Sequence, residues 1–193
     1  MTNKNFNDLS KEELVNILNQ GGLSEEEMIS LMMALKEKGM GGSIMAVDDS
    51  NNEEGRTATE YIEYHKKIPE SYYLNMPEEE IEWAREILLS KKSEIEDKKR
   101  ALIILAHKGR PDVYKTLEEY EKNPDPELKI WLNLAIQECQ SFLKSDIMDE
   151  PVLAINRVTK TGRNEECSCE SGKKYKKCCM SSVIFRKTSL LRF

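Results

Sequence analysis

The chain has 193 residues, of which 39% are hydrophobic and 33% are charged. This length suits one or two ordinary domains, and so much apolar material excludes a wholly disordered chain. Asp and Glu outnumber Lys and Arg by 35 to 29, and the resulting formal charge of −6 indicates, as an average, neither nucleic-acid nor membrane binding. Residues 1–10 lack the basic start and apolar core of an export signal. The longest uncharged apolar run, 101–106, is far below the ~20 residues that span a bilayer, so we expect no membrane span and a cytoplasmic protein.

A repeated local pattern predicts a helical hairpin over residues 1–39. Ser10 and Ser24 each stand three residues before a glutamate, Glu13 and Glu27, which is the pattern of a capping box at a helix start. The second helix is rich in methionine, which suits either an adaptable small core or a groove for a partner.

The next stretches predict a linker and then a helical domain. Residues 40–55 combine Gly, Ser, Asn and acidic residues without apolar periodicity, which is typical of a flexible linker. Helical patterns resume over 56–148, where Ser93 and Glu96 form a third capping-box pattern. Residues 99–140 resemble a HEAT-like helical repeat, with a Gly-Arg-Pro-Asp turn between paired helices. An antiparallel bundle with short loops would give much of the same pattern.

Few residues of this helical region suggest chemistry. His65 and His107 have no His or Glu partner at metal-binding spacing, so we expect ordinary surface or partly buried side chains. Cys139 lies within an apolar helical stretch and is expected to be a small buried hydrophobe rather than a reactive thiol. Neither a catalytic triad nor a phosphate-binding loop is recognisable, which predicts that the protein is not an enzyme and takes no small-molecule substrate.

The charge is divided unevenly along the chain. After a second predicted linker, residues 149–160, the composition becomes basic. Residues 156–193 contain ten basic and three acidic side chains, a formal charge of +7, so the preceding 155 residues carry −13. The sequence therefore predicts an acidic helical body joined to a basic tail.

Four cysteines lie close together within that basic tail. They are Cys167, Cys169, Cys178 and Cys179. Four thiolates at this spacing suit a tetrahedral Zn²⁺ ion in a closed structural site, although an incidental thiol cluster or a redox sensor would share the pattern. A segment this small cannot bury a core of its own, so metal binding would supply most of its folding free energy.

Residues 161–181 resemble the SEC-C zinc motif, the module that ends the SecA protein-translocation motor and is appended to many bacterial proteins. The resemblance lies in Gly-Arg-Asn before the Cys-x-Cys pair, in Ser-Gly-Lys-Lys-Tyr-Lys-Lys, and in the final Cys-Cys pair. It implies zinc at the four cysteines and a surface for protein partners, since the SecA module contacts the acidic export chaperone SecB and has been linked to ribosomes. Glu165, Glu166, Ser168 and Glu170 depart from the usual family residues. Translocation activity is not implied, because no motor or nucleotide loop accompanies the motif.

These features predict an all-α protein with an N-terminal hairpin, a HEAT-like array and a C-terminal zinc module, followed by a disordered tail over 182–193. We expect a non-catalytic zinc-binding adaptor with an acidic protein partner, possible partners being an export chaperone or the ribosome. The alternative is RNA or ribosome binding through the basic tail, where Tyr175 could stack on a base. The candidate partner-binding residues are Arg163, Lys173, Lys174, Tyr175, Lys176 and Lys177.

Overall fold

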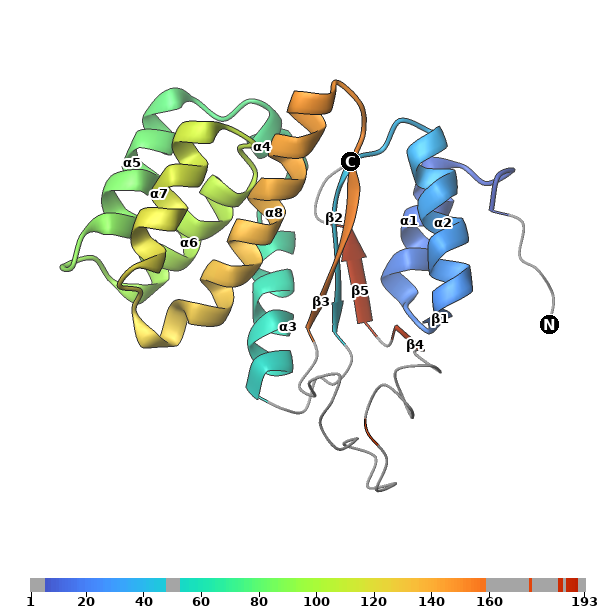
Figure 1. The fold of residues 1–193 in the computed structure, drawn as a ribbon, viewed down its shortest axis with the longest axis horizontal. Coiled ribbons are helices and arrows are strands. Elements are labelled where there is room, and N and C mark those ends of the chain that lie inside the picture. Colours follow the sequence, from blue (N-terminus) through green and yellow to red (C-terminus); the bar gives the residue numbers. More distant parts are fainter. Residues whose placement is uncertain (1–5, 48–52, 159–173, 175–183, 186, 191–193) are drawn as a thin grey trace.

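The fold is mostly helical, with a small sheet between two groups of helices (Figure 1). The computed structural model describes residues 6–47, 53–158, 174, 184–185 and 187–190. The helices are α1 (Lys11–Gln20), α2 (Glu25–Glu37), α3 (Glu53–Lys66), α4 (Glu70–Leu74), α5 (Glu78–Leu89), α6 (Ile95–Ala106), α7 (Pro111–Glu121), the 3-10 turn η1 (Pro126–Leu128) and α8 (Lys129–Met148). The strands are β1 (Leu23–Ser24), β2 (Gly42–Val47), β3 (Leu153–Val158), β4 (Ile184–Phe185) and β5 (Lys187–Leu190). The predicted helical character is confirmed, but the sheet was not expected.

Capping boxes begin the two N-terminal helices, as the sequence predicts. The backbone N–H of Glu13 donates to the Ser10 hydroxyl at 3.2 Å, and the Ser10 N–H donates to the Glu13 carboxylate at 2.8 Å. The same pair of bonds joins Ser24 and Glu27, at 3.2 and 2.9 Å. The third predicted box is wrong, because α6 is capped at Glu94 without a side-chain hydrogen bond.

The main sheet joins segments that are far apart in the sequence. Its strand order is β3-β2-β5, with β2 parallel to β3 and antiparallel to β5. Val47, at the end of β2, pairs with Val158 on one side and with Lys187 on the other. A second, two-stranded ladder pairs β1 with β4, at the start of α2.

Strand β2 corrects the prediction of a flexible linker over residues 40–55. All six of its residues are buried. Met45 and Val47 belong to the large core formed with α3–α8, whereas Ile44 and Ala46 belong to the core of α1 and α2. A strand covered on both faces has no polar alternation, and this explains why the stretch lacked a recognisable period. The N-terminal hairpin and the helical array are thus packed against opposite faces of one strand.

The two flanking strands correct two further expectations. Residues 149–160 were expected to form a linker, but they contain β3, and Gly42 N–H donates to the carbonyl of Val152 at 2.8 Å just before it. Residues 182–193 were expected to form a disordered tail, but they contain β4 and β5. Strands β3 and β5 pair with the two edges of β2, whereas β4 pairs with β1. An all-helical prediction offers no strand edges for such pairing.

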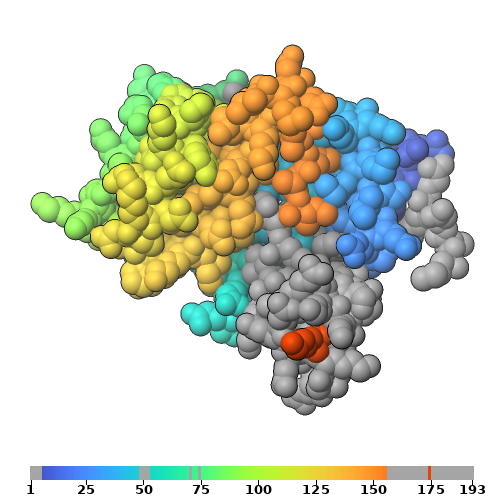
Figure 2. Space-filling view, in the orientation of Figure 1, coloured from blue at the N-terminus to red at the C-terminus, as the bar shows by residue number. Residues whose placement is uncertain are grey.

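The helices α3–α8 share one apolar core around the fully buried Trp131. Figure 2 shows the end of α8 and the residues after it, in orange, between this array and the N-terminal hairpin. A partly buried ion pair links α6 to the start of η1: Lys98, whose side chain is 4% exposed, lies 2.5 Å from the carboxylate of Asp125, which is 36% exposed. Among the described residues, no helix is both long and apolar enough to cross a membrane.

Candidate metal centres

The predicted zinc ligands Cys167, Cys169, Cys178 and Cys179 lie outside the described residues. So do five of the six predicted partner-binding residues, namely Arg163, Lys173, Tyr175, Lys176 and Lys177. The sixth, Lys174, is described and is exposed to solvent. The zinc ligation of the four cysteines and the binding roles of the basic residues stay predictions.

The described strands fix both ends of the segment that carries the cysteines. The chain leaves the main sheet after Val158, pairs with β1 through β4, and rejoins the main sheet through β5. Val158 and Lys187 flank Val47 on adjacent strands, so the two ends lie about 10 Å apart, twice the strand spacing. The cysteine-rich segment is therefore attached to the folded body at both ends, whereas the sequence suggested a module on a one-ended tail.

A second group of potential metal ligands lies inside the helical array. His65 is in the last turn of α3, His107 caps the C-terminal end of α6, and Glu138 is in the middle of α8. One ligand atom from each lies within 4.8 Å of the other two, and all three residues are buried. The expectation of surface or partly buried histidines is wrong, because both are buried and the helices bring together residues as far as 73 positions apart.

The carboxylate of Glu138 is the centre of this group. Its Oε2 accepts a hydrogen bond from the Tyr61 hydroxyl at 2.7 Å. Its Oε1 lies 3.2 Å from Nε2 of His65 and 3.4 Å from Nε2 of His107. The other ring nitrogen of His107, Nδ1, lies 2.8 Å from the Ile103 carbonyl oxygen. A carbonyl can only accept, so Nδ1 carries the proton and Nε2 of His107 is directed at the carboxylate.

The surroundings favour the charged form of Glu138. Burial alone raises the pKa of this carboxyl, but the two imidazoles and the Tyr61 hydroxyl outweigh burial and hold the pKa below its ordinary value. Burial and the nearby carboxylate raise the pKa of Tyr61 well above its usual range, which keeps its hydroxyl a donor. An ionised carboxylate in the core therefore faces two imidazole nitrogens.

Aromatic rings enclose the group. The rings of His65 and His107 are 4.3 Å apart between centroids, and Tyr73 stacks on His107 at 3.6 Å with an angle of 7°. The centroid of the Phe142 ring lies 5.7 Å from that of His107. The Tyr73 hydroxyl is buried and has no hydrogen-bond partner among the described residues. Such an apolar enclosure keeps the dielectric low and strengthens every electrostatic interaction within it.

Cys139, the neighbour of Glu138, is buried as the sequence predicts. Its thiol donates to the Lys108 carbonyl at 3.2 Å. Burial, with a contribution from Glu138, raises the pKa of Cys139 to about 12. A thiol with so high a pKa is unreactive at neutral pH, which supports the expected structural role.

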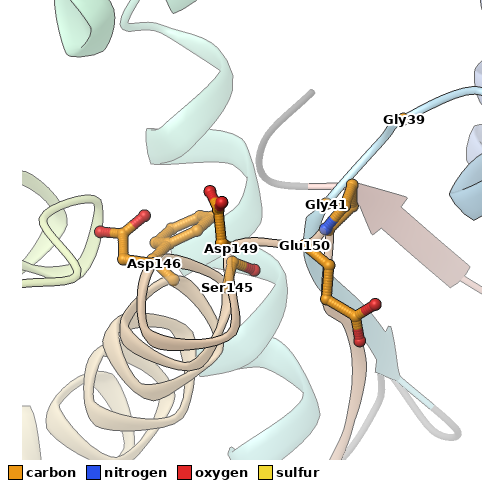
Figure 3. Close-up of a pocket in the computed structure, with 8 residues that line it drawn as sticks. Gly39, Gly41, Ser145, Asp146, Asp149 and Glu150 are labelled. Carbon is orange, nitrogen blue, oxygen red and sulfur yellow. The ribbon is translucent and has the colours of Figure 1, made fainter.

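An acidic cavity of about 380 Å³ lies between the end of α8 and the segment before β2. It is lined by Ser145, Asp146, Asp149 and Glu150 opposite Gly39 and Gly41 (Figure 3). Figure 3 shows the carboxylates of Asp146 and Glu150 pointing in different directions rather than toward one point. The cavity is therefore a negatively charged recess rather than a converging set of metal ligands.

Comparison with known proteins identifies the cysteine-rich segment only. The SEC-C motif family matches residues 163–181, a stretch that contains all four clustered cysteines. No curated protein and no solved structure shows a significant match to the chain. The chain thus carries a motif of a metal-binding class, and its four sulfur donors suit Zn²⁺. The HEAT-like character of residues 99–140 has no family match and stays a prediction.

Proposed function

We propose that this protein is a non-catalytic zinc-binding adaptor whose SEC-C segment recognises an acidic protein. The observation that carries the proposal is the SEC-C match over residues 163–181. Zinc would be held by Cys167, Cys169, Cys178 and Cys179, where it would supply a structural cross-link. Four cysteines fill a tetrahedral shell and leave no position for a substrate, so the site would fix the fold of the segment rather than perform chemistry.

Charge supports an acidic partner. The segment from residue 156 onward carries a formal +7, and the run Lys173, Lys174, Tyr175, Lys176, Lys177 lies between the two cysteine pairs. A zinc ion with four thiolates has a charge of −2, which leaves the segment positive. An acidic surface, such as that of an export chaperone, would be attracted to it, and the attraction would fall with added salt.

The attachment of the segment supports an adaptor with two contact surfaces. Because β3 and β5 fix both ends of the segment beside Val47, its distance from the helical body is limited. The body itself exposes Ile29 and Met33, one turn apart on α2, with 52% and 62% of their surfaces accessible. A pair of exposed apolar side chains on a helix is a suitable contact for a second protein.

A pull-down with the full-length chain tests the proposal. The double variant Cys178→Ser, Cys179→Ser should lose its zinc ion and should no longer capture the protein partner that the unsubstituted chain captures reproducibly. The fourfold change of Lys173, Lys174, Lys176 and Lys177 to Glu should keep the zinc and lose the same partner. A matched control reverses four exposed lysines of the helical body, namely Lys91, Lys92, Lys115 and Lys129. An identical partner list for all variants would refute the adaptor function.

RNA binding through the same lysines is the second candidate, favoured by Tyr175 between lysines. A gel-shift assay at low salt separates it from the adaptor. RNA binding predicts a shift that weakens steeply with salt and disappears in the fourfold lysine variant but not in the body-lysine control. The absence of any shift at low salt would eliminate this candidate and leave the adaptor untouched.

A further inference from the structure

We propose that His65, His107 and Glu138 form a second metal site, which binds one divalent transition-metal ion inside the helical array. This site is separate from the cysteine-rich segment in sequence and in ligand type. It does not depend on the proposed adaptor function. Its ligands come from α3, the end of α6 and α8, so a bound ion would join three helices of one core.

Two of the three separations between the ligand atoms match those around a metal ion. Nitrogen and oxygen ligands lie about 2.0–2.1 Å from Zn²⁺, so two of them in a tetrahedral shell are ~3.3 Å apart. Oε1 of Glu138 lies 3.2 Å from Nε2 of His65 and 3.4 Å from Nε2 of His107. The three ligand atoms are all mutually within 4.8 Å. Small side-chain adjustments would place one ion in contact with all three.

The hydrogen bond at Nδ1 of His107 gives a second geometric argument. Its Nδ1–H donates to the Ile103 carbonyl, so the other ring nitrogen, Nε2, is the one directed at the Glu138 carboxylate oxygen 3.4 Å away. Donation of the second ring nitrogen to a backbone carbonyl is the arrangement that metal-ligating histidines commonly show.

The neighbours of the group orient its ligands. The Tyr61 hydroxyl bonds Oε2 of Glu138 at 2.7 Å and leaves Oε1 toward the histidines. Tyr73 stacks on His107 and fixes the plane of its ring. Two imidazoles and one carboxylate suit Zn²⁺ and other borderline transition metals rather than Ca²⁺ or Mg²⁺. The enclosure by aromatic rings points to a structural rather than a catalytic ion.

Nuclear magnetic resonance of the imidazole nitrogens tests the site directly, because the chain contains only two histidines and both belong to it. Tag-free full-length protein is stripped with a chelator and titrated with Zn²⁺. We expect the Nε2 resonances of His65 and His107 to move together and to saturate at one ion in this site. If both resonances stay unchanged at saturating Zn²⁺, the group is a metal-free network that shares a proton, and the proposal is wrong.

Variants separate this site from the cysteines. In the full-length chain with all four clustered cysteines changed to Ser, Zn²⁺ should still move both imidazole signals. Glu138→Gln keeps the size of the side chain but removes its charge, and it should raise the Zn²⁺ concentration needed by about tenfold or more. Equal Zn²⁺ affinity in Glu138→Gln would overturn the ligand set. If a variant fails to fold, the titration of the unsubstituted chain decides alone. If only the four cysteines bind zinc, this second site is refuted and the adaptor proposal is unaffected. If only His65, His107 and Glu138 bind zinc, the adaptor proposal is refuted and this site is supported.

Discussion

Gly109 contacts the backbone of α8 and so keeps the end of α6 close to Glu138. The substitution Gly109→Ala tests this close contact. Gly109 lies two residues after His107, in the turn between α6 and α7. A Cβ atom added there would lie 2.5 Å from the Leu143 nitrogen and 2.5 Å from the Phe142 carbonyl carbon. It would also lie 2.8 Å from the Phe142 carbonyl oxygen. All three are backbone atoms of α8, so no side chain can rotate away.

The expected cost follows from these distances. Ordinary van der Waals contacts of a Cβ begin near 3.4 Å, so the turn must move away from α8 by almost 1 Å. Overpacking a tightly packed site costs about 1–3 kcal/mol. We expect the upper end of that range, about 3 kcal/mol, because the movement also strains the hydrogen bond from the Cys139 thiol to Lys108. With an m value of ~2 kcal/mol/M, the urea midpoint should fall by roughly 1–2 M.

Urea unfolding, followed by the fluorescence of Trp83 and the buried Trp131, measures this loss. Gly22→Ala is the matched control, because Gly22 has a φ of +76° and open space around the added Cβ. Its cost is therefore conformational only, about 1–2 kcal/mol. If Gly109→Ala proves no more destabilising than Gly22→Ala, the close approach of the turn to α8 is wrong, and so is the derived position of His107.

Three further predictions concern other contacts. Asp125→Asn removes the carboxylate bound by Lys98 and Tyr120 and should lower the unfolding free energy by about 1–2 kcal/mol at pH 7, with a discount for solvent exposure. Lys98 lowers the pKa of Asp125. The loss of unfolding free energy in Asp125→Asn should therefore be complete above pH ~4, and it should disappear as the pH falls through the lowered pKa, where the native Asp125 becomes protonated. Ser24→Ala should cost about 1 kcal/mol in thermal or urea unfolding through the lost cap of α2. Deletion of residues 184–193 should lower the melting temperature, because β2 loses its antiparallel neighbour, yet leave the zinc bound by the cysteines.

Each of these has a contradicting result. A difference between Asp125→Asn and the unsubstituted chain that persists unchanged at pH 2 would show that the carboxylate charge is not the cause. Ser24→Ala and Ser10→Ala remove caps of the same geometry, so a difference of more than a few tenths of a kcal/mol between their unfolding free energies would contradict the expected cost of the cap. An unchanged melting temperature after the deletion would mean that β5 does not contribute to the sheet.

Local signals in the sequence were sufficient for most helices. The pairs Ser10 with Glu13 and Ser24 with Glu27 act over three residues, and the structure reproduces both boxes. The capping box predicted at Ser93 does not form, because the cap of α6 is the next residue, Glu94. Capping patterns locate a helix start to within about one or two residues.

The sheet could not be predicted with the same rules. The run Ile44, Met45, Ala46, Val47 is apolar throughout and is a signal for a short buried strand, but the neighbouring Gly, Ser and Asn residues outweighed it. Its partners β3 and β5 lie more than a hundred residues away. Pairing over such distances depends on tertiary packing, which no local pattern records.

The buried group of His65, His107 and Glu138 has no sequence signal at all. The three residues lie on different helices at spacings that match no metal motif. Only the packing of α3 and α6 on α8 brings them together. The four clustered cysteines differ, because all their ligand atoms come from one short segment and their spacing alone indicates Zn²⁺.

Zinc release on thiol modification tests the central claim, that the four clustered cysteines hold one structural zinc ion. The native full-length chain is titrated with a thiol-specific mercurial in the presence of a zinc-sensitive dye. Because Cys139 is buried with a raised pKa, the four clustered cysteines should react first. We predict that one zinc ion is released per chain as these four thiols react. Four reactive thiols without any released zinc would contradict the account.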